Sequence, residues 1–223
     1  VDFLVSPYSY GFRGIGGEGV AMPPQDSLRV HGKLFIFEED SRIHLHPDET
    51  YGRVHTLEQS KAVLHRNFAQ VMTRGQAVWW HSGIDPAKDT DLQPIMSQMQ
   101  RLGTFGLSLD RTPSAEIAVI LDDESFYYET VRNDLDLPLI FQQRLWGLPR
   151  LGAPVDTYLL EDLCEGRVPP YKLYIFLNAF RLDDERREAL KAQIRRNGSV
   201  SVWMVAPGYI KEDASLDHME DLT

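Results

Sequence analysis

The chain has 223 residues, 43% of them hydrophobic and 25% charged, with a formal net charge of −10. These values are typical of a globular protein with one large domain or two small ones. The negative charge argues against a nucleic-acid partner, because binding phosphates needs a basic patch, and no apolar run reaches the ~18 residues of a membrane span. The one cysteine, Cys164, excludes an internal disulfide and favours a reducing compartment, so we expect a cytoplasmic protein. Val1 already lies in a strand-like segment, and residues 211–223 form an acidic tail without a clear structural end, so we expect that the chain is cut at both ends and leave secretion open.

The first half of the chain, residues 1–112, alternates strand-like apolar runs with helical periodicity. Thr56 and Gln59 form a capping-box pair at the start of one helix, and Gly75 closes that helix. This order of strand, long loop, strand, helix, strand and helix is typical of a parallel sheet. The elements that we expect are strands at 1–6, 33–38 and 77–80, a loop at 7–32, and helices at 57–74 and 92–102.

The second half, residues 113–223, repeats this α/β alternation. Asp183 is placed to cap a helix and Gly198 to end it. Four strands with helices between them favour an open, doubly wound sheet. The expected elements are strands at 116–122, 155–160, 172–177 and 200–205, and helices at 137–147 and 184–196.

The segment Lys33–Arg42 joins an apolar strand directly to three carboxylates and an arginine. The carboxyl end of a parallel strand is where α/β proteins present reacting groups. Side chains alternate along a strand, so Glu38 and Glu39 cannot both face one pocket. An arginine beside the carboxylate that faces the pocket would keep it ionised, which suits a nucleophile. A structural salt bridge would give the same pattern, and this alternative stays open.

Aromatic and cationic side chains lie at or just after the ends of the three strands of the first half. Aromatic faces at strand ends commonly hold sugar rings, while arginine binds their hydroxyls. Alternation predicts that one of the two adjacent tryptophans belongs to the core. The candidate substrate-binding residues are Tyr10, Arg13, Arg42, Trp79 and Trp80.

Three further patterns carry no predicted site. Gly14–Gly19 matches GxGxxG, but no strand ends directly before it and Pro23–Pro24 follows where a helix should begin, so no dinucleotide cofactor is expected. His44 and His46 lack a recognisable ligand spacing, so no metal is expected. Cys164 lies in a polar turn rather than in a nucleophile elbow, which argues against an amidotransferase.

The first half resembles a known family. Residues 2–10, Arg13, residues 31–42 and residues 75–80 together resemble the last third of the catalytic barrel of retaining, clan A glycoside hydrolases of the family 42 β-galactosidase group. The resemblance implies that residues 1–112 are the last strands of a (β/α)8 barrel. It also implies that Glu38 is the nucleophile at the end of the seventh barrel strand.

The second half is similar to that family's trimerisation domain at residues 115–119, 151–155 and 206–210. This domain has a flavodoxin-like fold, similar to class I glutamine amidotransferases but without their catalytic cysteine. The resemblance therefore implies a β-galactoside-like carbohydrate substrate and a homo-oligomer, a trimer, formed through residues 113–223.

The resemblance also implies that the chain is incomplete as an enzyme. The acid/base glutamate of the family lies near the end of the fourth strand, upstream of Val1, and a retaining mechanism needs two carboxyl groups. We therefore expect the isolated chain to be inactive. The alternative hypothesis is a non-catalytic association module.

Overall fold

The computed structural model describes residues 1–47, 50–81, 89–131 and 134–222. The chain divides into two compact units, and each contains one parallel sheet. Residues 24–32, which precede the second strand in sequence, belong to the second unit rather than to the first. No helix within the described ranges is long and apolar enough to cross a membrane. The first unit comprises Val1–Pro23 and Lys33–Pro113, and the second comprises Pro24–Gly32 and Ser114–Thr223.

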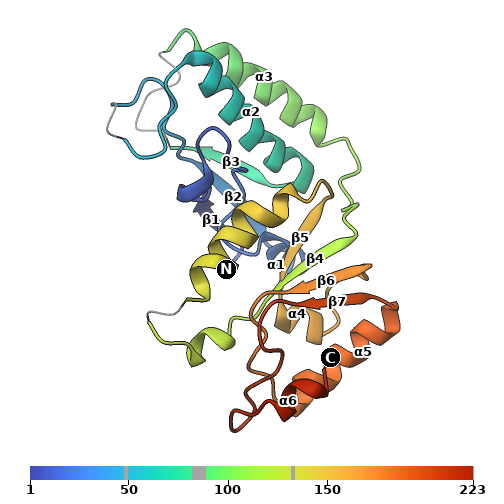
Figure 1. The fold of residues 1–223 in the computed structure, drawn as a ribbon. Coiled ribbons are helices and arrows are strands. Elements are labelled where there is room, and N and C mark those ends of the chain that lie inside the picture. Colours follow the sequence, from blue (N-terminus) through green and yellow to red (C-terminus); the bar gives the residue numbers. More distant parts are fainter. Residues whose placement is uncertain (48–49, 82–88, 132–133, 223) are drawn as a thin grey trace. The chain divides into compact units, whose positions relative to one another are not determined.

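The first unit is a three-stranded parallel sheet with the strand order β1-β2-β3. In Figure 1 the helices α2 and α3 run side by side in this unit. The helices bury an apolar cluster that includes Leu64, Ile95 and Met99. The elements are β1 (Phe3–Pro7), β2 (Leu34–Glu39), β3 (Ala77–Trp80), α2 (Leu57–Arg74) and α3 (Leu92–Gly106).

Local signals fix both ends of α2, as the sequence predicted. The Thr56 side chain accepts a hydrogen bond from the Gln59 backbone, and the Gln59 side chain bonds back to the Thr56 backbone. Gly75 ends the helix in the left-handed region, with φ 64°. The bounds of α2 and β3 therefore agree with the sequence prediction.

Helix α3 runs past Gly103, where the sequence predicted its end, and continues to Gly106. A Cβ atom on Gly103 would lie 3.5 Å from the Phe68 ring, and one on Gly106 would lie 2.5 Å from the Met72 methyl group. These glycines let α2 side chains pack directly against the α3 backbone. Tertiary packing thus outweighs the low helix propensity of glycine, which costs about 1 kcal/mol relative to alanine.

The second unit is a four-stranded parallel sheet with the strand order β5-β4-β6-β7. All four strands were predicted, and their parallel arrangement is confirmed. Strand β4 is buried along almost its whole length, as a strand covered on both faces should be. The strands are β4 (Ile117–Leu121), β5 (Val155–Leu159), β6 (Leu173–Phe176) and β7 (Val200–Trp203).

Helices cover the two faces of this sheet with separate apolar clusters. One cluster includes Leu163 of α4 and Leu190 of α5, and the other includes Leu139 and Ile140 of η3. Asp183 caps α5 by accepting a hydrogen bond from the Arg186 backbone, as predicted. The helices are α4 (Leu160–Cys164), α5 (Asp184–Asn197) and the π-helical segment η3 (Asp136–Gly147).

The remaining helical elements are short, and two of them, η1 and α1, lie within residues 7–32, which the sequence predicted to be a loop. Helix α1 contacts β5 in the second unit. The short elements are η1 (Tyr10–Phe12), α1 (Gln25–Val30), η2 (Ser125–Tyr128), η4 (Leu148–Arg150) and α6 (Asp217–Glu220).

Candidate functional site

Glu38 is the last residue but one of β2, the middle strand of the first sheet. It is the register partner of Pro7 on β1 and of Trp79 on β3, so Glu38 and Trp79 project from the same face of the sheet. His81 lies two residues beyond Trp79, and its Nε2 atom is 3.8 Å from Oε1 of Glu38. The rings of Trp79 and His81 are in contact, with centroids 5.1 Å apart. We call Glu38, Trp79 and His81 the Glu38 face.

The Glu38 face combines an accessible carboxylate with an exposed aromatic surface. The Glu38 side chain is 24% exposed and Trp79 is 51% exposed. Neither is needed to fill the core, so both are available to a ligand. His81 was not among the five predicted substrate-binding residues; its signal is its spacing of two residues from Trp79, which places it on the same face.

Glu39 points to the opposite face and lies beneath α2. It is only 3% exposed, and the Asn67 side-chain amide donates hydrogen bonds to both of its oxygens, at 3.2 and 3.0 Å. The Ser41 backbone N–H donates a third, at 3.2 Å. Burial raises the pKa of Glu39, while the bonds from Ser41 and Asn67 lower it. The side chains of the two adjacent glutamates thus project from opposite faces of the sheet, as the alternation along a strand predicted.

The two predicted arginines bind Asp40 instead of Glu38. Nη1 of Arg13 donates to the Asp40 backbone oxygen and to Oδ2, both at 3.0 Å, and Arg42 pairs with the other carboxylate oxygen. Asp40 is 5% exposed, and a buried charge is stable only when it is paired. The expectation that these arginines would balance the charge of Glu38 is therefore corrected. Tyr10 lies beside them, with its ring 4.4 Å from the Arg13 guanidinium carbon.

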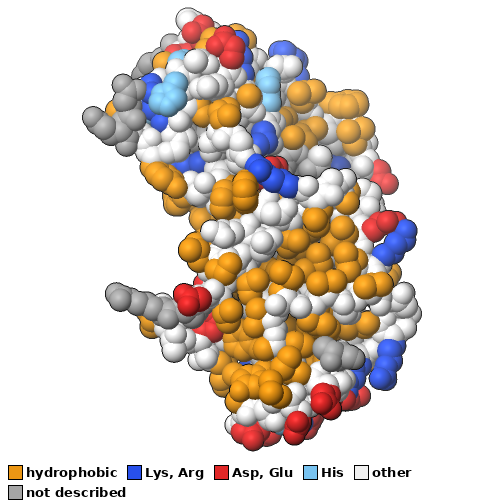
Figure 2. Space-filling view, in the orientation of Figure 1, with side chains coloured by type: hydrophobic (Ala, Val, Ile, Leu, Met, Phe, Trp, Pro, Cys, Tyr) orange, Lys and Arg blue, Asp and Glu red, His pale blue; other side chains and the backbone are white. Residues whose placement is uncertain are grey.

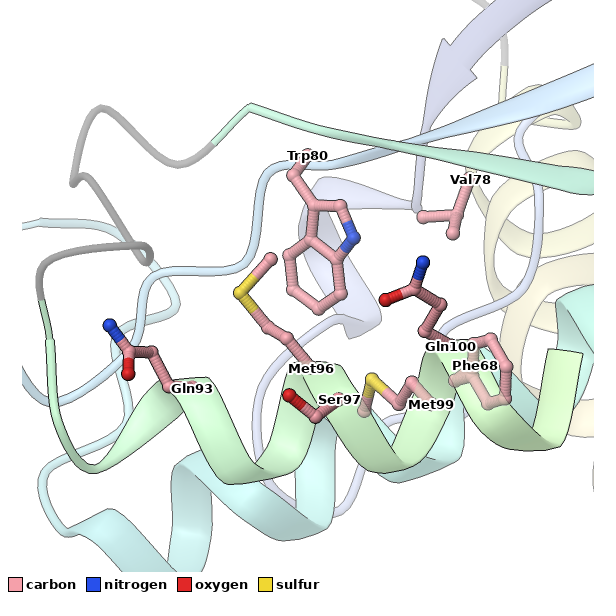
Figure 3. A pocket seen from close by; sticks show the side chains of 8 residues that line it. All are labelled: Phe68, Val78, Trp80, Gln93, Met96, Ser97, Met99 and Gln100. Atoms are coloured by element: carbon pink, nitrogen blue, oxygen red, sulfur yellow. The ribbon is translucent and has the colours of Figure 1, made fainter.

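Trp80 lies on the helix side of the sheet, away from the Glu38 face. It is the register partner of Glu39 and packs against the apolar cluster beneath α2 and α3. Figure 3 shows its indole ring next to Met96, above α3. Of the two predicted tryptophans, only Trp79 therefore shares a face with Glu38. Trp80 lines a groove of about 460 Å³ with Phe68, Val78, Gln93, Met96, Ser97, Met99 and Gln100.

A second polar cluster surrounds the carboxyl end of β4. Asp122 is fully buried, and its carboxylate accepts hydrogen bonds from Nη2 of Arg186, at 2.6 Å, and from Ser125. The Asn178 side-chain oxygen accepts a hydrogen bond from the Asp122 backbone N–H, and its NH2 group donates one to the Asp122 backbone oxygen, both at 2.8 Å. Burial raises the pKa of Asp122, and Arg186 opposes this shift. The Asp122 carboxylate is thus paired inside the protein, and these contacts hold the strand end in place.

The other candidate groups carry structural contacts. Burial raises the pKa of the Cys164 thiol to about 12, so it is a poor nucleophile, as its sequence context suggested. The ring of His44 bonds to the Ser60 hydroxyl, at 2.8 Å. Within the part of the chain that the structure describes, no three His, Cys, Asp or Glu side chains are grouped to hold a metal ion.

No family model matches the chain, and no curated protein matches it in sequence. Among solved structures, it is similar to Gan42B, a GH42 β-galactosidase, with a TM-score of 0.53 and 15% identity. The match covers 80% of this chain and 28% of the other, so this chain spans less than a third of its length. At this identity the likeness shows the fold alone. The chain has a mixed α/β fold with parallel sheets that is similar to part of a GH42 β-galactosidase.

Proposed function

We propose that this chain is part of a retaining glycoside hydrolase that acts on β-galactoside-like carbohydrate, and that Glu38 is its nucleophile. The observation that carries the proposal is the position of Glu38, which lies next to the carboxyl end of the middle strand of a parallel sheet, on the face that it shares with the exposed Trp79. The carboxyl ends of barrel strands carry the reacting groups of (β/α)8 enzymes. The likeness to a GH42 β-galactosidase structure supports the same interpretation.

In this mechanism the Glu38 carboxylate attacks the anomeric carbon and forms a glycosyl ester, and the leaving oxygen takes a proton from an acid. Water then cleaves the ester and restores the carboxylate. The indole of Trp79 stacks on the sugar ring. His81, 3.8 Å from Glu38, orients the carboxylate or binds a sugar hydroxyl.

The acid/base belongs to another part of the enzyme in this proposal. A retaining mechanism needs a second carboxyl group about 5–5.5 Å from the nucleophile. We propose that it lies outside these 223 residues, so the isolated chain does not hydrolyse aryl galactosides. The first unit would then be the last three strands of a (β/α)8 barrel, with its remaining strands supplied by the same enzyme.

The second unit would be the association domain of the enzyme. Its strand order, numbered within the unit, is 2-1-3-4, which is the order of the first four strands of a flavodoxin-like sheet. This supports the proposal of a flavodoxin-like, trimerisation-type domain.

The test uses the natural polypeptide that contains this chain, with an aryl β-galactoside as substrate. Glu38→Gln should abolish turnover. Glu38→Ala should regain turnover with added azide and give the α-galactosyl azide, because azide replaces the carboxylate as nucleophile. The matched control is the neighbouring change Glu39→Gln, which lies on the opposite face and should keep the turnover of the folded protein. Equal losses in the two Gln variants, or full activity in Glu38→Gln, would refute the assignment.

A second candidate is a non-catalytic association module. Figure 2 shows hydrophobic side chains gathered over the strands of the second unit. Val200, Val202 and Met204 are between 40% and 63% exposed. Contiguous exposed apolar surface of this kind often marks an interaction site. Sedimentation of the 223-residue chain tests this role, because a monomer at every concentration would count against it.

A further inference from the structure

Helix α1 lies against the outer edge of the second unit's sheet. Strand β5 is an edge strand in the order β5-β4-β6-β7, so only one of its sides pairs with another strand. The backbone N–H groups of Thr157 and Leu159 point to the other side. An edge strand with free N–H and C=O groups is a template for pairing with another chain.

Side chains of α1 accept hydrogen bonds from these two N–H groups. Oδ2 of Asp26 accepts a hydrogen bond from the Thr157 backbone N–H at 2.8 Å, and Oγ of Ser27 accepts one from the Leu159 backbone N–H at 2.7 Å. Asp26 is 2% exposed and Ser27 is 3% exposed, so both bonds are sheltered from water. Successive residues of the helix thus replace the two backbone acceptors that a neighbouring strand would supply.

Further contacts hold α1 in this position. Nη2 of Arg29 donates to the Tyr158 hydroxyl at 2.7 Å and lies 3.7 Å from an Asp156 oxygen. His31, just after the helix, lies 2.5 Å from Asp162. A helix of six residues has little stability of its own, so these contacts and those of Asp26 and Ser27 keep it in place.

We propose that α1 is a built-in competitor for the β5 edge, and that a chain whose α1 cannot bond this edge associates with a second copy through β5. The occupant of the freed edge is the β5 strand of the second copy, antiparallel and related by a two-fold axis. An arrangement centred on Thr157 places Asp156 opposite Tyr158 and avoids opposing carboxylates. In the same arrangement Val155 faces Leu159, and outward N–H groups meet outward carbonyls.

The experiment compares the wild-type chain with an Asp26→Ala/Ser27→Ala variant by amide hydrogen exchange and sedimentation. In dilute solution the amides of Thr157 and Leu159 should exchange at least about tenfold faster in the variant. With rising concentration, the mass of the variant should increase beyond that of the wild type. The matched control is Ser108→Ala/Asp110→Ala, which removes the same two side chains at exposed positions of the first unit and should behave as the wild type.

Two more variants separate edge pairing from unfolding. Adding Thr157→Pro to the double variant deletes the central N–H donor, so the mass should return to the wild-type value. Ser27→Ala alone should release the Leu159 amide and leave the Thr157 amide protected. Any of three outcomes would overturn the proposal. The triple variant could still associate, or the double variant could keep the wild-type mass although both of its amides exchange freely. The third is a Leu159 amide that stays protected in Ser27→Ala.

Discussion

Replacing Asn67 with alanine should destabilise the first unit strongly. Asn67 is fully buried, and its amide donates to both oxygens of Glu39 and to the Ser41 hydroxyl, at 2.9 Å. In Asn67→Ala the buried carboxylate keeps only its hydrogen bonds from the backbone and side chain of Ser41. A hydrogen bond to a charged group contributes about 1.5–3 kcal/mol, and the lost amide also leaves a small cavity. We expect the free energy of unfolding to fall by about 3 kcal/mol, a large part of the ~5–15 kcal/mol typical of a domain.

The loss should grow with pH. Burial raises the pKa of Glu39 and the Asn67 hydrogen bond lowers it, so the substitution raises the pKa further. Above the ordinary pKa of a glutamate, the folded state then holds its proton more tightly than the unfolded state, and stability falls as the pH rises. Each further pKa unit removes about 1.4 kcal/mol at a pH above both values. The deficit of Asn67→Ala should therefore be larger at about pH 8 than at about pH 4.

Urea unfolding, monitored through the hydrogen exchange of the α2 amides, measures this loss of stability in the first unit. Gln98→Ala, at an exposed position of α3, is the control and should change stability by less than about 0.5 kcal/mol. On a Glu39→Gln background, Asn67→Ala should cost only about 1 kcal/mol, because no charge is left unpaired. A deficit below about 1 kcal/mol in the wild-type background, or one that shrinks with pH, would refute the reasoning.

Four more substitutions test particular contacts. Arg186→Met should cost about 3–5 kcal/mol, because it leaves Asp122 charged, buried and without its ion-pair partner; urea unfolding of the second unit measures this. Thr56→Ala removes the N-cap of α2 and should lower the free energy of unfolding by about 1 kcal/mol; a lower midpoint of thermal unfolding of the variant would show this. Trp80→Ala should destabilise the first unit by more than about 2 kcal/mol, whereas Trp79→Ala should cost less than about 1 kcal/mol; equal losses would contradict their assignment to opposite faces.

Local chemistry predicted the regular elements of the first unit well. The capping box at Thr56 and the glycine at Gly75 fixed the limits of α2, because both signals lie within one turn of the helix end. Helix α1 had no such signal. Its stability comes from bonds between Asp26 or Ser27 and a strand about 130 residues later, and no local pattern encodes a partner at that separation.

The candidate site was predictable only in part. Alternation required that Glu38 and Glu39 face opposite sides, but only the resemblance to a family indicated which one faces the site. The partner of Arg13 could not be predicted, because an arginine reaches several carboxylates and the choice depends on burial. Asp40 is the buried carboxylate that needs charge compensation, and Arg13 therefore binds it.

The glycines of α3 make substitution at the helix pair asymmetric. The Met72 methyl group occupies the volume that a side chain on Gly106 would need, whereas a Cβ atom on Gly103 would only contact the Phe68 ring. A smaller residue on α2 would leave a void that neighbouring atoms can partly fill, whereas any side chain on Gly106 would force the Met72 side chain to move. We therefore expect more sequence variation at the α2 positions of this contact than at Gly106, where the absence of a side chain leaves room for Met72.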